Sequence, residues 1–361
     1  MRSVIRLTCL VFLLASGHAF ADTLQGPMRL PATVARQPAR ALLITVMHAG
    51  ARLLAVGGRG MIIYSDDNGQ SWHQAAVPTS ETITDAAFAD AKHGWAAGAQ
   101  GVVLHTDDGG ATWQLQLTGD QVIPLMNTAA AQYAAANPGT AASALAVRRA
   151  GIFTQAGPNK PFLTILPLSA QSAIIFGAYR MTVMTTDGGK TWEDWSLHVG
   201  DPVSHGIFDV ARMGNAIYLT GESGVVLRST DQGQSFTMLA SPDPSTMFGI
   251  LATPKGTLLT FGVAGEVFRS TDNGASWAQA SISSDADLTA GVVLSSGEIL
   301  VVSEDGGVFA SQDDGQNFKS IGLNEGMALY GVTQAPNGDV VFAGSNGVRV
   351  VPASAITQAK S

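Results

Sequence analysis

Six aspartates recur within the same octapeptide, and a repeated carboxylate is the first candidate for metal binding or acid–base catalysis. Each octapeptide has Ser or Thr first, Asp third, Gly fifth and Trp or Phe eighth; the aspartates are Asp67, Asp108, Asp187, Asp231, Asp272 and Asp313. Calcium loops end with an acidic ligand that these segments lack, and no reaction needs six copies of one catalytic group. Asp, Ser, Thr and Gly in this arrangement instead favour a tight turn whose side chains bond to the backbone.

The octapeptide is the Asp-box of BNR repeats, and its spacing predicts the architecture. Successive aspartates are 41, 79, 44, 41 and 41 residues apart. A turn position recurs with the same period, each time fifteen residues after the expected start of an inner strand, at Gly57, Gly98, Gly177, Gly221, Gly262, Ser303 and Gly344. Four-stranded units of about 40–45 residues are typical of propeller blades. We therefore predict an all-β fold, a seven-bladed β-propeller.

The seventh unit differs from the others because it has no Asp-box. The unit runs from Ala328 to Ala355 and has three expected strands. A ring with an incomplete last blade needs a strand from elsewhere to cover the exposed edge. We predict that the segment Met28–Arg36, which precedes the first unit, supplies this fourth strand.

The 79-residue interval holds an insertion, residues 119–158, between blades 2 and 3. Residues 125–136 and 140–150 are rich in alanine, and an Asn-Pro-Gly sequence separates them. Alanine favours helix, while Thr140 can cap the second segment and Gly151 can end it. We predict a helical hairpin, which either packs as a loop elaboration or serves as a lid or docking element.

Loops that join one blade to the next open on the face opposite the Asp-boxes, so the hairpin is expected to stand over that face. Loops on a rigid scaffold commonly carry function. The candidate partner-binding residues on this face are Arg59, Tyr179, Arg180, Arg148, Arg149, His205 and Glu222.

The N-terminus has the features of a secretory signal peptide, predicted for residues 1–21. Two arginines precede an apolar run that ends in an Ala-x-Ala cleavage pattern. We expect the rest, 22–361, to form one exported, periplasmic propeller domain, because no later apolar run is long enough to span a membrane. The single cysteine, Cys9, lies in the signal, so the mature chain has no thiol for catalysis or zinc.

Charge and composition limit the classes of binding partner that are expected. The chain has 20 Lys and Arg against 28 Asp and Glu, a net charge of −8. Nucleic acids and anionic membranes need a basic surface, so neither is an expected partner. The histidines show no zinc-binding spacing. We expect a monomer that needs no metal and no cofactor.

The second blade carries a family resemblance. The stretch Asp85–Gly101, followed by the box Thr106–Trp113, resembles the photosystem II stability/assembly factor family of BNR-repeat propellers. The resemblance implies a non-catalytic exported propeller that binds membrane-protein segments during complex assembly, with arginines on one face. Similar proteins in non-photosynthetic bacteria accompany resistance-nodulation-division transporters, so the implied partner is a membrane protein or transporter of the envelope. The helical insertion and the few face arginines depart from the family pattern.

A glycoside hydrolase of sialidase type is the alternative, because such enzymes also carry Asp-boxes. They need three arginines, a Tyr/Glu nucleophile pair and an acidic Asp on the open face. Met28–Pro31 is similar to the arginine motif that opens sialidases but lies about a dozen residues too early. The residues from which such a site would have to be assembled are Arg59, Arg180, Tyr179, Glu222 and Asp305.

Overall fold

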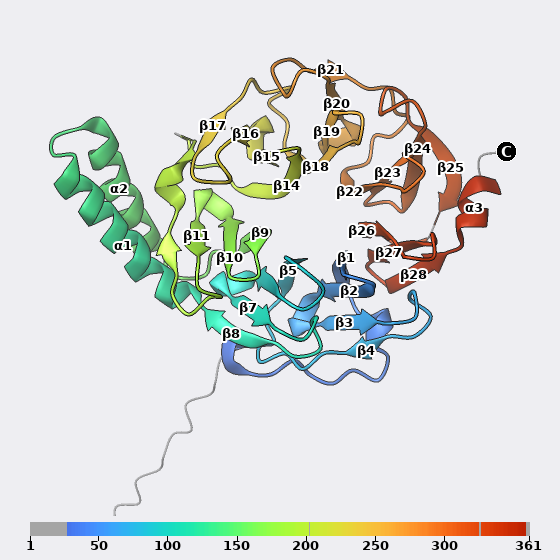
Figure 1. Cartoon of the computed structure of the whole chain (residues 1–361), viewed down its shortest axis with the longest axis horizontal. Coiled ribbons are helices and arrows are strands. Elements are labelled where there is room, and N and C mark those ends of the chain that lie inside the picture. The colour runs from blue at the N-terminus through green and yellow to red at the C-terminus, as the bar shows by residue number, and fades with distance from the viewer. Residues whose placement is uncertain (1–26, 202, 325, 359–361) are drawn as a thin grey trace, which may run out of the picture.

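The computed structural model describes residues 27–201, 203–324 and 326–358. The predicted signal peptide, residues 1–21, and Cys9 within it lie outside the described residues. Strands predominate and form seven separate sheets in a ring around a central opening (Figure 1). The first strand of each four-stranded set lies nearest the opening. No helix in the described part is long and apolar enough to cross a bilayer.

The first half of the ring contains four sheets. The first sheet consists of β1 (Leu43–Ala49), β2 (Arg52–Gly57), β3 (Ile62–Ser65) and β4 (His73–Gln74). The second consists of β5 (Ile83–Phe88), β6 (Gly94–Gly98), β7 (Val103–Thr106) and β8 (Gln114–Leu117). The third consists of β9 (Phe162–Ser169), β10 (Ser172–Gly177), β11 (Thr182–Thr185) and β12 (Glu193–Asp194). The fourth consists of β14 (Ile207–Met213), β15 (Ala216–Gly221), β16 (Val226–Ser229), β17 (Phe236–Met238) and, parallel to β17, the short β13 (Val199–Gly200).

Three further sheets complete the ring. The fifth consists of β18 (Met247–Ala252), β19 (Leu258–Gly262), β20 (Val267–Ser270) and β21 (Ala278–Gln279). The sixth consists of β22 (Leu288–Val293), β23 (Ile299–Ser303), β24 (Gly307–Ser311) and β25 (Lys319–Asn324). The seventh consists of β26 (Leu329–Gln334), β27 (Val340–Gly344) and β28 (Gly347–Val351), after which the short helix α3 (Ala353–Gln358) follows.

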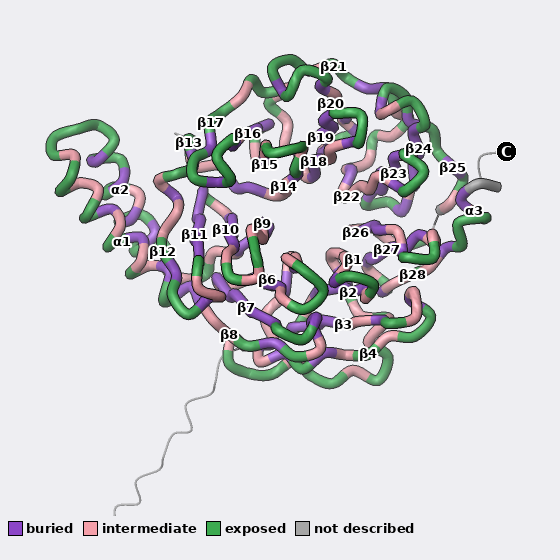
Figure 2. Tube along the Cα trace, in the orientation of Figure 1, coloured by how far each residue is buried: buried purple, intermediate pink, exposed green. Residues whose placement is uncertain are grey.

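The core lies between neighbouring sheets. Trp95 and Val103 of the second sheet pack with Phe162 and Ile175 of the third, and all four are fully buried. The second strands are buried along almost their whole length, as the purple segments of Figure 2 show, because a neighbouring sheet covers each face. Burial on both faces explains why so much of the sequence is apolar and uncharged.

Each Asp-box forms a closed turn between the third and fourth strands. In the second sheet, Thr106 Oγ1 donates to Asp108 Oδ1 at 2.8 Å and accepts the N–H of Gly110 at 3.0 Å. The backbone N–H of Thr112 donates to the same Asp108 oxygen at 3.0 Å. A Cβ on Gly110 would lie 2.2 Å from Leu54 Cδ2, so glycine lets the turn pack against the first sheet. Hydrogen bonds from the Ser or Thr side chain four residues later lower the pKa to about 2 for Asp67, Asp187, Asp231 and Asp272.

The prediction that Met28–Arg36 completes the seventh sheet is wrong, because within the described residues that sheet has three strands. The segment instead lies along the outer side of the first sheet, where Ala32 N donates to Val77 O at 3.0 Å. The short helix η2 (Pro38–Arg40) lies against β28. A second bond, from Ala35 N to Gln74 Oε1 at 2.8 Å, also holds the segment on the first sheet, and Ala35, with Ala39 and Ala41 after it, packs against the core shared by the first and seventh sheets.

Two helices lie between β8 and β9: α1 (Gly119–Ala136) and α2 (Ala141–Ala156). They run side by side at the edge of the ring (Figure 1). α1 begins six residues before the expected start because Thr118 and Gln121 form a capping box. α2 continues through Gly151, which was expected to end it, because Phe153 in the following turn is buried against the ring; Gly157, at φ 78°, is the residue after the helix.

Candidate binding site

The turns that join second to third strands lie on the face opposite the Asp-boxes. Five of them are short 3-10 helices: η3 (Gly58–Gly60), η4 (Ala99–Gly101), η5 (Ala178–Arg180), η7 (Glu222–Gly224) and η8 (Val263–Gly265). The middle residue of each turn has a φ between 53° and 59°; these residues are Arg59, Gln100, Tyr179, Ser223 and Ala264. The shared left-handed conformation projects these five side chains from equivalent positions on the same face.

One of these turns departs from the others at its last residue. Four end in a glycine with φ between 66° and 73°. A Cβ on Gly60 would lie 2.0 Å from Thr79 O, which shows how closely the following loop crosses the turn. In η5 this position is Arg180, with a φ of 60°. A left-handed non-glycine residue costs about 1–2 kcal/mol, so η5, which has two such residues, carries more backbone strain than the other four turns, which have one each.

The Arg180 side chain turns inward and holds the loop that follows the third sheet. It is 7% exposed, and its Nη1 donates to the backbone oxygens of Val199, at 3.2 Å, and Asp201. Its backbone N–H donates to His205 O at 3.0 Å. The Asp201 carboxylate, also buried, accepts the N–H of Val203 at 2.9 Å and a bond from the His205 ring. Arg180 therefore anchors residues 199–205, apart from residue 202, which is not described.

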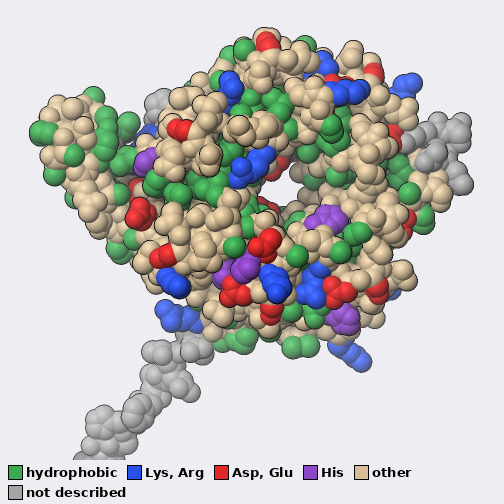
Figure 3. All heavy atoms as spheres, in the orientation of Figure 1, with side chains coloured by type: hydrophobic (Ala, Val, Ile, Leu, Met, Phe, Trp, Pro, Cys, Tyr) green, Lys and Arg blue, Asp and Glu red, His purple; other side chains and the backbone are tan. Residues whose placement is uncertain are grey.

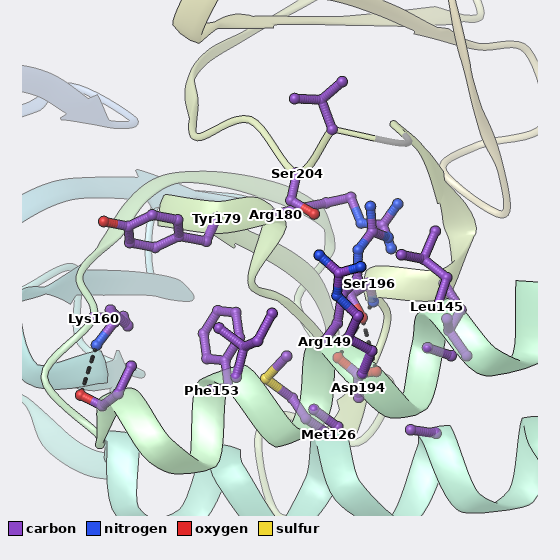
Figure 4. Close-up of a pocket in the computed structure, with 18 residues that line it drawn as sticks. Met126, Leu145, Arg149, Phe153, Lys160, Tyr179, Arg180, Asp194, Ser196 and Ser204 are labelled. Carbon is purple, nitrogen blue, oxygen red and sulfur yellow. Dashed lines mark hydrogen bonds between the residues drawn. The ribbon is translucent and has the colours of Figure 1, made fainter.

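A pocket of about 490 Å³ lies between this anchored loop, the η5 turn and the two helices (Figure 4). Most of its wall is apolar, with Met126 from α1 and Leu145, Ile152 and Phe153 from α2. Phe153 meets the Tyr179 ring edge to face, with 6.4 Å between the centroids. The ionisable side chains on the wall are Arg148, Arg149, Lys160, Arg180 and Asp194.

Burial shifts the pKa of two charged groups of the pocket, Arg149 and Asp194. Arg149 Nη2 donates to Asp201 O at 3.1 Å, the carbonyl that Arg180 also contacts. Burial lowers the pKa of Arg149, against the opposing effect of the Asp201 carboxylate. Burial raises the pKa of Asp194 to about 6, although Ser196 donates to it from both its N–H and its hydroxyl. Lys160 caps the end of α2 through the carbonyls of residues 156 and 157.

The structure brings some of the sequence-predicted residues together and separates others. Four of them line the pocket: Tyr179, Arg180, Arg148 and Arg149. His205 lies beside it in the anchored loop. Glu222 accepts the N–H of Gly206 at 2.8 Å, and Arg59 is exposed on the first sheet, so neither lines the pocket. Asp201 and Lys160 were missed because they lie in segments that have no counterpart in the repeat. Asp194, in the fourth strand of its unit, was missed because nothing near it in the sequence shows that it is buried.

The central channel is a second hollow, of about 680 Å³, whose opening is visible in Figure 3. Asp85 and Asp209 lie on its wall, and burial raises their pKa to about 7 and about 6. Each carboxylate accepts a backbone N–H from the next sheet, Ile165 at 3.1 Å and Ile250 at 2.9 Å. These aspartates therefore join neighbouring sheets.

The residues proposed for a hydrolase do not converge. Arg180 and Tyr179 lie at the hairpin pocket, whereas Arg59, Glu222 and Asp305 line neither that pocket nor the channel. Asp305 accepts a bond from Ser303 Oγ at 2.5 Å within its own turn. In the described ranges, no three His, Asp or Glu side chains are grouped so that they could hold a metal ion.

Comparison with models of protein families shows to which family the chain belongs. The model of the Photosynthesis system II assembly factor YCF48 family matches residues 70–127 and 160–321, more than half of the chain. The chain belongs to this family. A BNR/Asp-box repeat matches residues 63–74. The YCF48 model leaves residues 128–159 unmatched, which include the second half of α1 and all of α2.

Known proteins agree with this assignment. The Photosystem II assembly lipoprotein Ycf48 of Synechococcus sp. (strain CC9902) is 31% identical over 86 residues, which are 24% of this chain and 25% of the relative. The structure of YCF48 bound to D1 peptide has a TM-score of 0.62 at 16% identity and covers 90% of this chain and 99% of that one. YCF48 from Cyanidioschyzon merolae has a TM-score of 0.61 at 15% identity, with coverages of 88% and 96%. The WD40 β-propeller domain of Doa1 has a TM-score of 0.60 at 10% identity, with coverages of 90% and 96%. The fold is a β-propeller.

Proposed function

We propose that this chain is a non-catalytic, protein-binding assembly factor that acts on a membrane protein of the cell envelope, including a transporter as one possible client. Membership of the YCF48 family and the likeness to a propeller bound to a D1 peptide support protein binding. We further propose a seven-bladed propeller over 22–361, with residues 119–158 inserted between blades 2 and 3. An N-terminal signal, residues 1–21, would direct a monomeric chain to the periplasm.

The observation that carries a docking role for the hairpin is the clustering of exposed apolar side chains. Leu145 and Ile152 of α2 are 36% and 51% exposed, Tyr179 of the adjacent turn is 57% exposed, and Val203 of the anchored loop is 69% exposed; all four line the pocket. Contiguous exposed apolar surface on a folded protein marks an interaction site. The exposed Arg59 and Arg148 on the same face add positive charge suited to an acidic partner segment.

A binding role also agrees with how the carboxylates are used. Asp85 and Asp209 in the channel accept backbone N–H groups of the next sheet. The Asp-box aspartates bond within their own turns. Because the residues needed for a sialidase lie in separate places, no specific observation favours the hydrolase alternative.

Capture of a membrane protein tests the proposal. The mature chain is immobilised and incubated with detergent-solubilised envelope of its own source cells, and bound proteins are identified by mass spectrometry. A variant in which residues 120–157 are replaced by a short Gly-Ser linker removes the hairpin. A Cβ on Gly119 would lie 1.9 Å from Pro158 O, so the two ends already meet and the ring is expected to fold.

We expect one membrane protein to be enriched by the wild type and lost by at least fivefold in the linker variant. Arg59→Glu should weaken capture, whereas Lys92→Glu, an exposed cation on the Asp-box face, should leave it unchanged. Equal capture by the linker variant would refute a docking role for the hairpin. Turnover of a panel of aryl glycosides, abolished by Arg59→Ala, would overturn the non-catalytic assignment.

A further inference from the structure

The hairpin pocket concentrates positive charge in a protein that is acidic as a whole. Four of the chain's 20 Lys and Arg residues line it, together with one carboxyl group, Asp194. Ser196 already donates two hydrogen bonds to Asp194, and burial raises the pKa of this carboxyl to about 6. The wall therefore has an excess of cationic hydrogen-bond donors, which favours an anion.

Two guanidinium groups converge at one point of this wall. Arg149 Nη2 and Arg180 Nη1 both donate to the carbonyl oxygen of Asp201, and Figure 4 shows the two side chains close together above the helices. The buried Asp201 carboxylate offsets part of this charge through its attraction to Arg149, but four Lys and Arg side chains line the pocket against one carboxyl group on its wall. Arg180 is also 93% buried with no hydrogen-bond partner for its Nε among the described residues. An anion beside these groups would add negative charge to a mainly cationic wall and would give Arg180 Nε an acceptor.

The rest of the pocket is apolar and large enough for more than an inorganic ion. Its volume of about 490 Å³ lies within the usual range for small-molecule sites, about 300–1,000 Å³. Met126 and Phe153 form the buried part of the wall, and Leu145, Ile152 and Tyr179 form the exposed part. A ligand that fits this surface has an apolar body and an anionic end.

The backbone strain at Arg180 points to the same place. Arg180 is the non-glycine residue at a position where four equivalent turns have glycine. Strained residues cluster at ligand sites because the surrounding structure holds them there for function. Here the strain places a guanidinium on the pocket wall.

We propose that the hairpin pocket binds a small amphipathic carboxylate, with an alkyl chain of about ten carbons packed against Met126 and Phe153 and the carboxylate held by Arg149 and Arg180. A peptide would need acceptors for its own amides, and the charged acceptor on the wall, Asp194, is already bonded to Ser196. The alkyl carboxylate needs only donors at one end and apolar surface elsewhere. The pocket shares Leu145, Ile152, Tyr179 and Val203 with the docking surface proposed above, but titration of the isolated chain tests the small-ligand site separately from the protein-binding role.

Calorimetric titration of the mature chain tests the site. Octanoate, decanoate and dodecanoate are titrated below their micellar concentrations at pH 7.5, with decanol and decyltrimethylammonium as uncharged and cationic counterparts. We expect one molecule of decanoate to bind, an affinity gain of up to about fourfold per added methylene, and at least tenfold weaker binding of decanol. Equal binding of decanoate and decanol, or of all three decyl compounds, would overturn the proposal.

Variants test the contacts to the carboxylate and the contacts to the alkyl chain separately. Arg149→Gln should weaken decanoate at least tenfold and leave decanol unchanged, with Lys92→Gln on the opposite face as the matched control. Leu145→Gln and Ile152→Gln alter exposed residues of α2, so folding is retained, and they should flatten the dependence on chain length. If Arg149→Gln does not fold, the comparison of decanoate with decanol and the two α2 variants still test the proposal. If an octapeptide with an apolar carboxyl-terminal residue binds while decanoate does not, the site takes a peptide and the proposal is wrong.

Discussion

Replacement of the first residue of an Asp-box by an apolar isostere tests how the turn is held. In the second sheet, Thr106 is 2% exposed, and its Oγ1 accepts the buried N–H of Gly110 at 3.0 Å and the N–H of Asp108 at 3.3 Å. The same hydroxyl donates to the Asp108 carboxylate at 2.8 Å. Thr106→Val keeps the shape of the side chain but leaves the Gly110 donor buried without an acceptor.

The expected loss follows from these contacts. An unsatisfied buried donor costs about 1–3 kcal/mol, and the lost bond to the carboxylate adds to it, so we expect the free energy of unfolding to fall by about 3 kcal/mol. For a chain of this length such a loss lowers the Tm by about 4 °C. Urea unfolding followed by circular dichroism and by tryptophan fluorescence measures the change.

The same box supplies a matched control. Thr112 Oγ1 donates to the other oxygen of Asp108 at 2.6 Å, but Thr112 is exposed, so water can replace the lost bond in Thr112→Val. We expect that variant to lose less than about 1 kcal/mol. Thr185→Val and Thr191→Val repeat the comparison in the third sheet, where Gly189 N–H donates to Thr185 Oγ1 at 2.9 Å. Equal losses for the buried and exposed members of both pairs would refute the reasoning.

Two further predictions concern pH and the glycine turns. Burial raises the pKa of Asp85 to about 7 and of Asp209 to about 6, from a usual 3.8. The folded state therefore binds these two protons more tightly than the unfolded state does. Their contribution to the free energy of unfolding is complete below pH 4 and is lost as the pH rises toward 7. Asp85→Asn should therefore flatten the fall of the urea midpoint between pH 5 and pH 7; an unchanged slope would contradict this. Gly60→Ala should destabilise by more than about 2 kcal/mol in urea, because its Cβ would meet Thr79 O at 2.0 Å in addition to the strain of a φ of 70°. Gly139→Ala, with a φ of 74° and open space around it, should lose about 1 kcal/mol; similar losses for the two would argue against the close crossing.

The repeat made much of the fold predictable. Each Asp-box has its turn chemistry within eight residues, so its local structure does not depend on distant contacts. The 41-residue interval then places the strands on either side, and the resemblance of the second unit indicated the family to which the chain belongs. The alanine-rich segment 125–136 lies within α1, and 140–150 lies within α2 except for Thr140, which caps it as expected.

Two predictions, the place of Met28–Arg36 and the end of the second helix, were wrong because local sequence does not decide which part of the fold a segment contacts. Met28–Arg36 has the length for a strand against β28, but hydrogen bonds to Val77 and Gln74 hold it on the first sheet. Gly151 looked like a helix end, yet burial of Phe153 one turn later extends α2. Such competition is decided by tertiary packing, which local propensity does not contain.

The Asp-box turns, the succession of strands and the family could be predicted from the residues alone, because each depends on residues close together in the chain or on their regular spacing. The meeting of Arg149 and Arg180, 31 residues apart, at the carbonyl of Asp201, and the separation of Arg59 from them, depend on contacts between distant parts of the chain. The repeat places Arg180 on a turn, but it does not say that its side chain points inward. That direction follows from the unique loop after the third sheet and from the helices that cover it, so the candidate site lies where the repeat is broken.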